Sequence, residues 1–390
     1  MDWRRRKKKK KRRTLERGAM LLEELIECCD GKSNPIKFFS AHEIHKATNN
    51  FNKYNQVSKY SDPYYKWYSG KDKNHPMIVI RKPLFDSYRH GNFYRDVAVS
   101  SMVSGHKNFM KMVGCCLEFD CPAIVYHGVK KHDQLNHIIS RQTWKRRMKI
   151  AEDIATALAY LHTAFPRPFV YRNMWLENIL LDEDGVAKLS DFSYCVAIPK
   201  GETFVKVYSS LYGDIYMDSK YMKDGVVSVE TDVYAFGMLM QKLLNGFREV
   251  WVDKLFHRIT GKEISDDSII EKDLRRRYIQ NWLLKLMEEG RMDEITDPKM
   301  LEKMGEISEG ELCQMKAFLM LSHRCIGEVE LPTMVEVAKE LKKIQRSIKS
   351  ESSSPSGETQ FDSPQHIASS SSQTRLKYKG ILMKCFNGLF

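Results

Sequence analysis

The sequence lacks any apolar stretch that approaches the roughly 18 residues needed to cross a membrane. Its strongly basic N-terminus is not followed by the apolar stretch of roughly 7–15 residues that marks a secretory signal, so we expect no such signal. The nine cysteines are odd in number and form no C-x-x-C pair. This usage predicts reduced thiols in an intracellular protein rather than a disulfide framework.

Acidic residues are almost missing from the N-terminus, where Arg4 through Arg13 are ten consecutive basic residues. Residues 1–17 carry +9 of the net charge of +13, so the rest of the chain is close to neutral. Three interpretations of this run stay open: a solvated arm, a segment attracted to an anionic membrane leaflet, or a nuclear import signal or nucleic-acid patch. Trp3 alone does not make an aromatic-interleaved surface, so we expect no specific nucleic-acid binding. Cys28 and Cys29 are either buried or palmitoylated.

The composition divides the chain into segments. Like charges repel, so residues 1–18 are predicted to form a disordered basic arm, followed by an N-terminal extension over 19–50 with a short helix from Ala19 to Cys29. Residues 51–347 have the composition of a folded domain. Residues 348–390 are predicted to form a disordered tail, because serine-rich sequence cannot build a core.

Two textures appear within the folded segment. Residues 51–130 contain short apolar runs, such as 77–80 and 123–126, that predict strands. From Trp144 onward, apolar residues recur at intervals of three and four, which predicts helices over about 144–161 and 231–244. The expected fold class is therefore α+β, with a small β-rich N-lobe (51–130) and a larger helical C-lobe (131–347).

Six motifs, in order, resemble those of the protein kinases and in particular the plant receptor-like kinases. They are F-S…A-T-N-N-F at 39–51, H-K-N…G-C-C at 106–116, Y-R-N…N-I-L-L at 171–181, D-F-S at 191–193, D-V-Y-A-F-G at 232–237 and L-P-T-M at 331–334. The degenerate motifs and the short chain resemble the plant pseudokinase group ZRK. This resemblance implies a bilobal protein-kinase fold.

The nucleotide-binding positions are altered. No glycine occurs between Phe51 and Ser69, and Val57, Lys59 and Asp62 align with the glycines of the phosphate-binding loop. Arg81 aligns with the lysine that holds the α- and β-phosphates, and its planar fork is not equivalent to an ammonium group. Lys82 would serve only after a one-residue shift of the strand.

The helix carboxylate that pairs with this lysine in kinases aligns with Val97. Asp96, one residue earlier, has two interpretations: a solvated helix carboxylate, which we favour, or the partner of Arg81 in a helix with an extra residue.

The catalytic loop has lost its chemistry. Asn173 replaces the aspartate that accepts the substrate proton, and an amide is not a base at neutral pH. Trp175 replaces a lysine that neutralises the transferred phosphate, and Ser193 replaces the glycine of D-F-G. Asn178 and Asp191 keep the metal-binding residue types, either as vestigial nucleotide and metal positions or as local hydrogen-bonding groups, which we favour.

Framework positions are kept. Arg172, Phe192 and Asp232 match the structural residues of the family, and Tyr171 can fill the packing place of the histidine. Lys220 aligns with the glutamate that closes the activation segment, and Leu331 aligns with its arginine partner. Their joint loss predicts that this segment is no longer pinned as in kinases, with Lys220 reaching solvent over Leu331.

The resemblance implies a catalytically inactive adaptor in plant immune signalling. Its expected partners are an intracellular leucine-rich-repeat immune receptor and active receptor-like cytoplasmic kinases. We expect no cofactor and no metal, a cytoplasmic location that includes the inner face of the plasma membrane or the nucleus, and, through residues 4–13, contact with an anionic membrane surface. The alternative is a weak or atypical Ser/Thr kinase that binds ATP and Mg²⁺ with Arg81 and Asp191.

Overall fold

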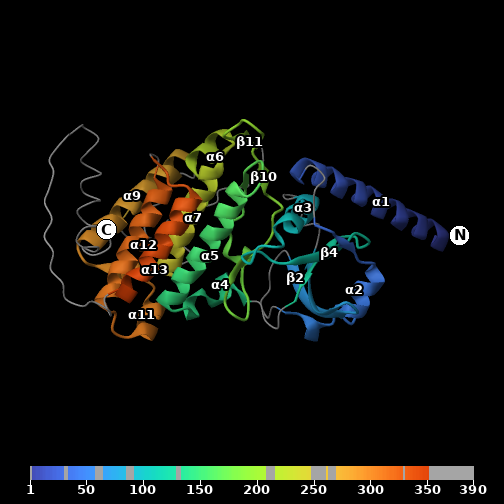
Figure 1. The fold of residues 1–390 in the computed structure, drawn as a ribbon, viewed down its shortest axis with the longest axis horizontal. Helices are drawn as coiled ribbons and strands as arrows, with labels where there is room; N and C mark the ends of the chain where they lie inside the picture. Colours follow the sequence, from blue (N-terminus) through green and yellow to red (C-terminus); the bar gives the residue numbers. More distant parts are fainter. Residues whose placement is uncertain are drawn as a thin grey trace.

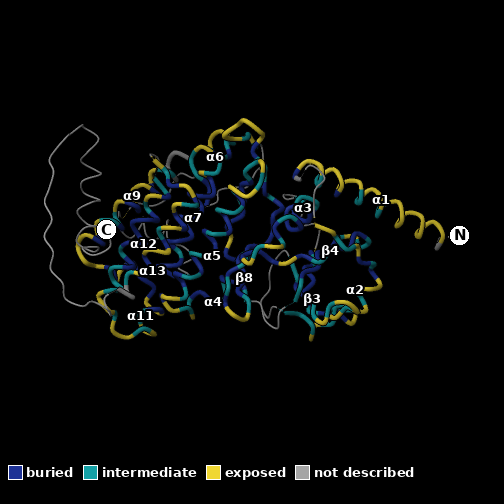
Figure 2. Tube along the Cα trace, viewed as in Figure 1, coloured by how far each residue is buried: buried dark blue, intermediate teal, exposed yellow. Residues whose placement is uncertain are grey.

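The structure is a computed structural model that describes residues 2–29, 34–57, 65–84, 92–128, 133–207, 216–246, 261, 269–327 and 330–350. It has two lobes, a sheet-containing N-lobe and a helical C-lobe, with the long helix α1 at the outer edge of the N-lobe (Figure 1). Figure 2 shows that buried residues line the inside of both lobes, while α1 is largely exposed. The expected fold class, a bilobal α+β kinase fold, is confirmed.

A five-stranded sheet in the order β1-β4-β5-β3-β2 forms the N-lobe. Its strands are β1 (Lys37–Phe38), β2 (Tyr65–Asp72), β3 (His75–Pro83), β4 (Met112–Cys116) and β5 (Ala123–His127). The helix α3 (Phe93–Val103) packs against it, and Asn92 caps this helix by accepting hydrogen bonds from two backbone N–H groups. These elements place β3 and α3 side by side, which sets up the candidate site.

Part of the segment expected to precede the N-lobe belongs to it. β1 pairs in parallel with β4, and α2 (Ala41–Ala47) packs through buried Ile44 against the same sheet. Gly114 permits this close approach, because a Cβ atom there would lie 1.9 Å from the carbonyl oxygen of Lys37. The folded domain therefore begins before residue 51.

The expectation of a disordered arm over residues 1–18 is wrong. A single helix, α1 (Asp2–Cys29), includes the whole basic run. Charge repulsion within the run is offset by contacts from outside it: Lys10 pairs with Glu118 at 3.1 Å, and Arg13 pairs with Asp120 at 2.5 Å. Leu21 is buried against the N-lobe. Tertiary contacts of this kind override local propensity.

The C-lobe is built around α5 (Trp144–Thr163) and α7 (Val229–Asn245), which match the helices that periodicity predicts. Most apolar residues of α5 are buried, while Ala159 and Tyr160 are partly exposed. The other C-lobe helices are α4 (Leu135–Ile138), α6 (Ser219–Asp224), α9 (Ile269–Glu288), α10 (Met292–Ile295), α11 (Pro298–Met304), α12 (Glu309–Ile326) and α13 (Met334–Ser350). Residues 351–390, and with them most of the expected serine-rich tail, lie outside the described residues.

Between residues 133 and 227, short strands arrange the loops that carry the candidate site. They are β6 (Asp133–Gln134), β7 (Phe169–Val170), β8 (Ile179–Leu181), β9 (Ala187–Leu189), β10 (Val196–Ala197), β11 (Val205–Lys206) and β12 (Val226–Val227), with the short 3₁₀ helices Lys53–Asn55, Ile139–Arg141 and Leu176–Asn178. β8 pairs with β6 and β9, while β10 pairs with β7. This pairing brings segment 171–178, which follows β7, next to segment 190–195, which follows β9. The two segments carry the candidate site.

Candidate functional site

Arg81 lies at the centre of the site. It sits on β3 with only 1% of its surface exposed, and its guanidinium group lies 4.6 Å from the ring centroid of Tyr65 and 5.9 Å from that of Trp67. Lys82 is on the opposite side of the strand, 4.0 Å from the ring centroid of Phe51, where burial lowers its pKa. The structure thus places Arg81, and not Lys82, at the position of the kinase lysine.

The expectation that Asp96 is a solvated carboxylate is wrong. Asp96 is fully buried on α3, forms an ion pair with Arg81, and accepts a hydrogen bond from the backbone N–H of Phe192 at 2.9 Å. Val97, the position that the motif spacing indicated, is buried in the N-lobe core instead. Compared with the lysine–glutamate pair of active kinases, the cation is longer and the carboxylate is shorter. The ion pair therefore persists with both of its partners replaced.

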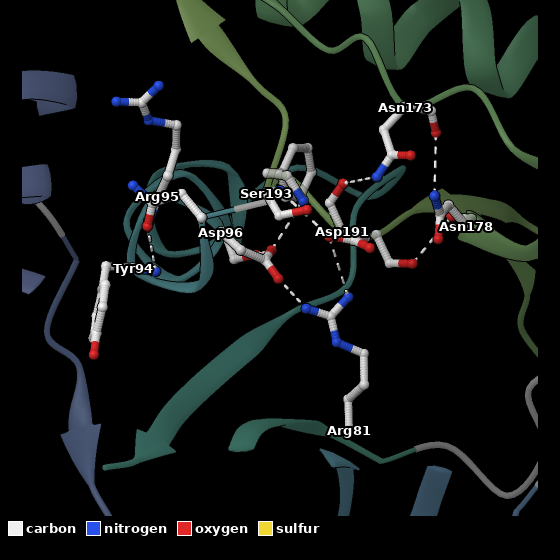
Figure 3. A network of polar contacts seen from close by, with 12 residues as sticks. Arg81, Tyr94, Arg95, Asp96, Asn173, Asn178, Asp191 and Ser193 are labelled. Atoms are coloured by element: carbon white, nitrogen blue, oxygen red, sulfur yellow. Dashed lines mark hydrogen bonds and ion pairs between the residues drawn. The ribbon is translucent and has the colours of Figure 1, made fainter. Parts of the chain in front are cut away.

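Asp191 completes a buried cluster of three charges. One of its carboxylate oxygens lies 3.9 Å from Nη1 of Arg81, so the planar fork of the arginine reaches carboxylates from both lobes (Figure 3). Burial raises the pKa of Asp96 to about 6, and the positive charge of Arg81 opposes this shift. One internal cation therefore lies between the two carboxylates, and a guanidinium group keeps this charge at every physiological pH.

The two other polar residues of the centre are committed to backbone contacts. The side-chain amide of Asn173 donates to the carbonyl oxygen of Asp191 at 2.9 Å, and that of Asn178 donates to the carbonyl oxygen of Asn173 at 3.2 Å (Figure 3). The backbone N–H of Ser193 donates to the carboxylate of Asp191 at 3.3 Å. These bonds tie the altered catalytic loop to the D-F-S segment.

Asp232, on α7, fixes the start of the catalytic loop through hydrogen bonds. Its carboxylate accepts hydrogen bonds from the backbone N–H groups of Tyr171 at 2.7 Å and Arg172 at 2.9 Å, and it contacts His162 at 2.9 Å. Arg172 and Asp191 both adopt φ of +60°, a conformation that is uncommon for residues other than glycine. The kinase-like framework thus holds a strained backbone at the two segments that surround the former active centre.

An aromatic stack joins the lobes behind this loop. Phe192 packs edge-on against Tyr171 with ring centroids 5.6 Å apart and lies 5.8 Å from Phe109. The hydroxyl group of Tyr171 donates to the carbonyl oxygen of Ser190 at 2.6 Å, and burial raises its pKa. Tyr171 therefore fills the histidine place and adds a hydrogen bond.

Val79, which aligns with the alanine that packs on adenine in active kinases, lies in a buried apolar cluster. Val79, Trp67, Tyr126 and Leu180 belong to one buried apolar cluster, with Leu180 contributed by the C-lobe strand β8. Trp67 and Tyr126 have ring centroids 5.9 Å apart. The apolar side chains of the two lobes are therefore buried against one another in this region.

The phosphate-binding loop falls mostly outside the described residues. Lys59 and Asp62 lie there, while Val57 donates its backbone N–H to the carbonyl oxygen of Trp67 at 2.9 Å. Their predicted effect on phosphate binding therefore stays a prediction.

The end of the activation segment, residues 216–224, is held by contacts other than the ion pair of kinases. α9 replaces the lost ion pair: Asp273 accepts a hydrogen bond from Ser219, and Arg276 donates to the carbonyl oxygen of Met217 at 2.9 Å. Lys220 is 71% exposed and pairs with Glu230 at 3.4 Å. Sequence alignment missed this arrangement because it compares positions with a family pattern, whereas the new contacts come from a helix outside the aligned motifs.

Leu331 is half-buried just before α13. Whether the stem of Lys220 packs on Leu331 stays a prediction.

These residues do not fit a nucleotide-bound magnesium ion. Asp191 faces the guanidinium group of Arg81 rather than open space, and Asn178 uses its amide group within the loop. Among the described residues, no cluster of three or more histidine, cysteine or acidic side chains has metal-binding geometry. No helix in the described part of the chain is long and apolar enough to span a bilayer.

A kinase fold that has an amide in place of its catalytic base, and whose metal-binding position Asp191 faces an internal arginine, is that of a pseudokinase. The sequence profile of the protein tyrosine and serine/threonine kinase family matches residues 58–297. A solved structure, the pseudokinase domain of BIR2, described as an immune regulator of the RLK/Pelle family, matches with a TM-score of 0.52 and 19% identity. The match covers 80% of this chain and 87% of that one, and it shows the shared fold.

Two relatives from Arabidopsis thaliana are much more similar. A probable inactive receptor-like protein kinase is 59% identical over 95% of this chain and 98% of its own length. The inactive serine/threonine-protein kinase ZRK12 is 60% identical over 96% of this chain and 90% of its own length. The chain therefore belongs to the protein tyrosine and serine/threonine kinase family and, within it, to the catalytically inactive ZRK-like receptor-like cytoplasmic kinases.

Proposed function

We propose that the chain is an adaptor in plant immune signalling. One surface binds an intracellular leucine-rich-repeat immune receptor, and a second captures active receptor-like cytoplasmic kinases in the cytoplasm. The observation that carries this proposal is the internal ion pair of Arg81, which keeps the kinase framework assembled without the groups that phosphoryl transfer requires. A framework kept after the loss of its chemistry supports a role in binding other proteins.

The proposed kinase-binding surface is centred on Trp175. This side chain stands at a substrate-facing position of the catalytic loop, is 44% exposed, and packs edge-on against Tyr216 with ring centroids 5.9 Å apart. A tryptophan that is rigidly supported and still exposed is the residue type that most often dominates a protein interface. The chain thus presents an apolar anchor where an active kinase presents a charged lysine.

Binding in this proposal needs no nucleotide. Arg81 supplies the positive charge between Asp96 and Asp191, so ATP and Mg²⁺ are not needed to hold the lobes together. The proposed adaptor therefore works with no cofactor and no metal ion.

The test is a binding titration with a panel of purified, active receptor-like cytoplasmic kinases. We expect at least one to bind, and we expect Trp175→Ala to weaken that binding roughly 30-fold, the effect of an interface hot spot. Asn178→Ala changes a vestigial metal position and should leave the affinity unchanged, as should the control Tyr54→Ala, whose side chain is 85% exposed on the N-lobe.

Co-expression with leucine-rich-repeat immune receptors followed by size-exclusion chromatography tests the second partner. Failure of every kinase and every receptor to bind would refute the adaptor function. Binding that survives Trp175→Ala but depends on Asn178 and on Mg-ATP would instead support the atypical-kinase alternative.

A further inference from the structure

One side of α1 is fixed to the N-lobe. Arg17 donates to the carbonyl oxygens of Leu117 and Asp120 at 2.9 and 2.6 Å. About two turns further along the helix, Glu24 pairs with Arg95 of α3 at 2.8 Å. Contacts at both positions fix the rotation of α1 about its own axis, so the same residues always face away from the protein.

The opposite side of α1 combines charge and apolar surface. At about 100° per residue, six exposed residues fall within a sector of about 80°. They are Arg4, Lys8, Lys11, Leu15, Leu22 and Ile26. The basic residues come first along the helix and the aliphatic residues follow, and the latter are 76%, 57% and 56% exposed in that order.

We propose that this face of α1 binds an anionic lipid bilayer. The basic half would lie on the phosphate headgroups, and Leu15, Leu22 and Ile26 would enter the boundary between headgroups and acyl chains. A bilayer offers a broad negative surface and an apolar layer directly beneath it, and a helix with these two features lies in that interface. The proposal does not depend on the adaptor function.

The arrangement favours a bilayer over a nucleic acid. Phosphates of DNA or RNA would satisfy the basic half, but their backbone offers no apolar layer for three aliphatic side chains that lie about one to four turns beyond Lys11 along the helix. It also differs from a solvated arm, because a merely solvated segment gains nothing from a stripe of exposed aliphatic residues on a rigidly held helix.

The position of α1 makes this face accessible. The helix lies at the outer edge of the N-lobe (Figure 1), and most of its residues are exposed (Figure 2). The nearest acidic side chains on the helix are turned from the stripe: Glu16 pairs with Arg12 at 2.8 Å, and Glu27 pairs with Arg95 at 3.1 Å. Glu23 lies about 90° from the centre of the stripe.

The test is flotation of the full chain with phosphatidylcholine vesicles that contain or lack phosphatidylserine. We expect binding only with phosphatidylserine, weakened by salt. Leu22→Asn should lower the vesicle partition coefficient about tenfold, because it removes one inserted aliphatic side chain. The triple variant Arg4→Ser, Lys8→Ser and Lys11→Ser should lower it by about 100-fold, at about fivefold for each charge.

Two matched controls separate this face from general charge and hydrophobicity. Leu274→Asn changes an equally exposed leucine, 55% against 57%, on the C-lobe helix α9. The triple variant Lys145→Ser, Lys299→Ser and Lys342→Ser removes the same net charge from exposed C-lobe positions. Both should float like the unchanged protein, and circular dichroism checks that every variant is folded.

Two outcomes overturn the proposal. One is a partition coefficient that is the same with and without phosphatidylserine, or that is zero in both cases. The other is a chain that binds duplex DNA or RNA and is displaced from vesicles by it, with Leu22→Asn having no effect. The second outcome would make the basic run a phosphate-binding patch for nucleic acid.

Discussion

Replacing Arg81 with methionine should test whether its role is structural. The substitution keeps an unbranched apolar stem and removes the cation that, among the described residues, contacts both Asp96 and Asp191. Breaking a buried ion pair by removing one partner costs about 3–5 kcal/mol of unfolding free energy. Asp96 keeps its hydrogen bonds from Phe192 and Ser100, so we expect the lower end, about 3 kcal/mol.

The cost should depend on pH, with a sign set by the carboxylate that remains. Burial already raises the pKa of Asp96 to about 6, and loss of the arginine would raise it further. A carboxyl group whose pKa is higher in the folded than in the unfolded state favours folding when it is protonated. The variant should therefore be closest to the unchanged protein near pH 5 and lose stability as the pH rises to 8, by up to about 1.4 kcal/mol per pH unit.

Urea unfolding at these two pH values, followed by tryptophan fluorescence, measures the effect. Lys82→Met is the matched control on the same strand: it removes a cation 4.0 Å from the ring centroid of Phe51 and should cost only about 0.5–1 kcal/mol. Adding Asp96→Leu to Arg81→Met should recover about 2 kcal/mol, since an apolar pair replaces the ion pair. A cost below about 1 kcal/mol at pH 8, or the same cost at both pH values, would refute this reasoning.

Further predictions concern the site, its support and the N-lobe. Purified protein should transfer no phosphate to itself or to a generic substrate, and millimolar Mg-ATP should leave its melting temperature unchanged, whereas a ligand at 100 times its Kd would stabilise by about 2.7 kcal/mol; a rise of several degrees would show nucleotide binding. Asp273→Ala should cost about 1–3 kcal/mol by urea unfolding through loss of its bond with Ser219, and the exposed control Glu302→Ala should cost almost nothing. Hydrogen bonding to Lys37 and then to His75 lowers the pKa of Asp72 to about 2, so stability present above pH 4 should fall between pH 4 and 2, and Lys37→Met should reduce that fall; an unchanged acid limb would show that the pair is solvated.

The sequence could predict the fold because the motifs that define it are local and ordered. Apolar spacing in residues 144–161 fixes α5, and the segment around Asp232 fixes the helix that supports the catalytic loop. The replacement of the catalytic aspartate by Asn173 is visible for the same reason, since it needs only an alignment of neighbouring residues. Chemistry lost within a motif can be read from sequence alone.

Gains between motifs could not be predicted in this way. Asp96 faces Arg81 because Asn92 begins α3 at a particular residue, and one additional residue before His106 shifts the carboxylate from the aligned position. The Arg81–Asp96 pair is also difficult to recognise in the sequence, because each residue considered alone looks like the loss of a kinase residue. Reading Arg81 and Asp96 together, as partners changed in compensating directions, would have been the available signal.

The helix α1 shows the same limit at longer range. Ten adjacent positive charges predict disorder when only their neighbours in sequence are considered. The contacts that stabilise the helix come from Glu118, Asp120 and Arg95, which lie about 70 to 110 residues from their partners in α1. Local composition contains no information about such contacts. Helical structure in proteins depends mainly on such tertiary packing.

Arg81 and α9 together explain how the fold persists without its reaction. In an active kinase, a nucleotide and its metal ions contribute charge between the lobes, and the contribution ends when they leave. Here Arg81 of β3 itself lies beside Asp191, the residue type that binds a metal ion in active kinases, and α9 holds the end of the activation segment through Asp273 and Arg276. Both sets of contacts belong to the chain itself, so we expect the surface around Trp175 to keep one arrangement at any nucleotide concentration. The binding surface that we propose around Trp175 benefits from this constancy, because a protein that is already ordered loses less entropy when its partner docks.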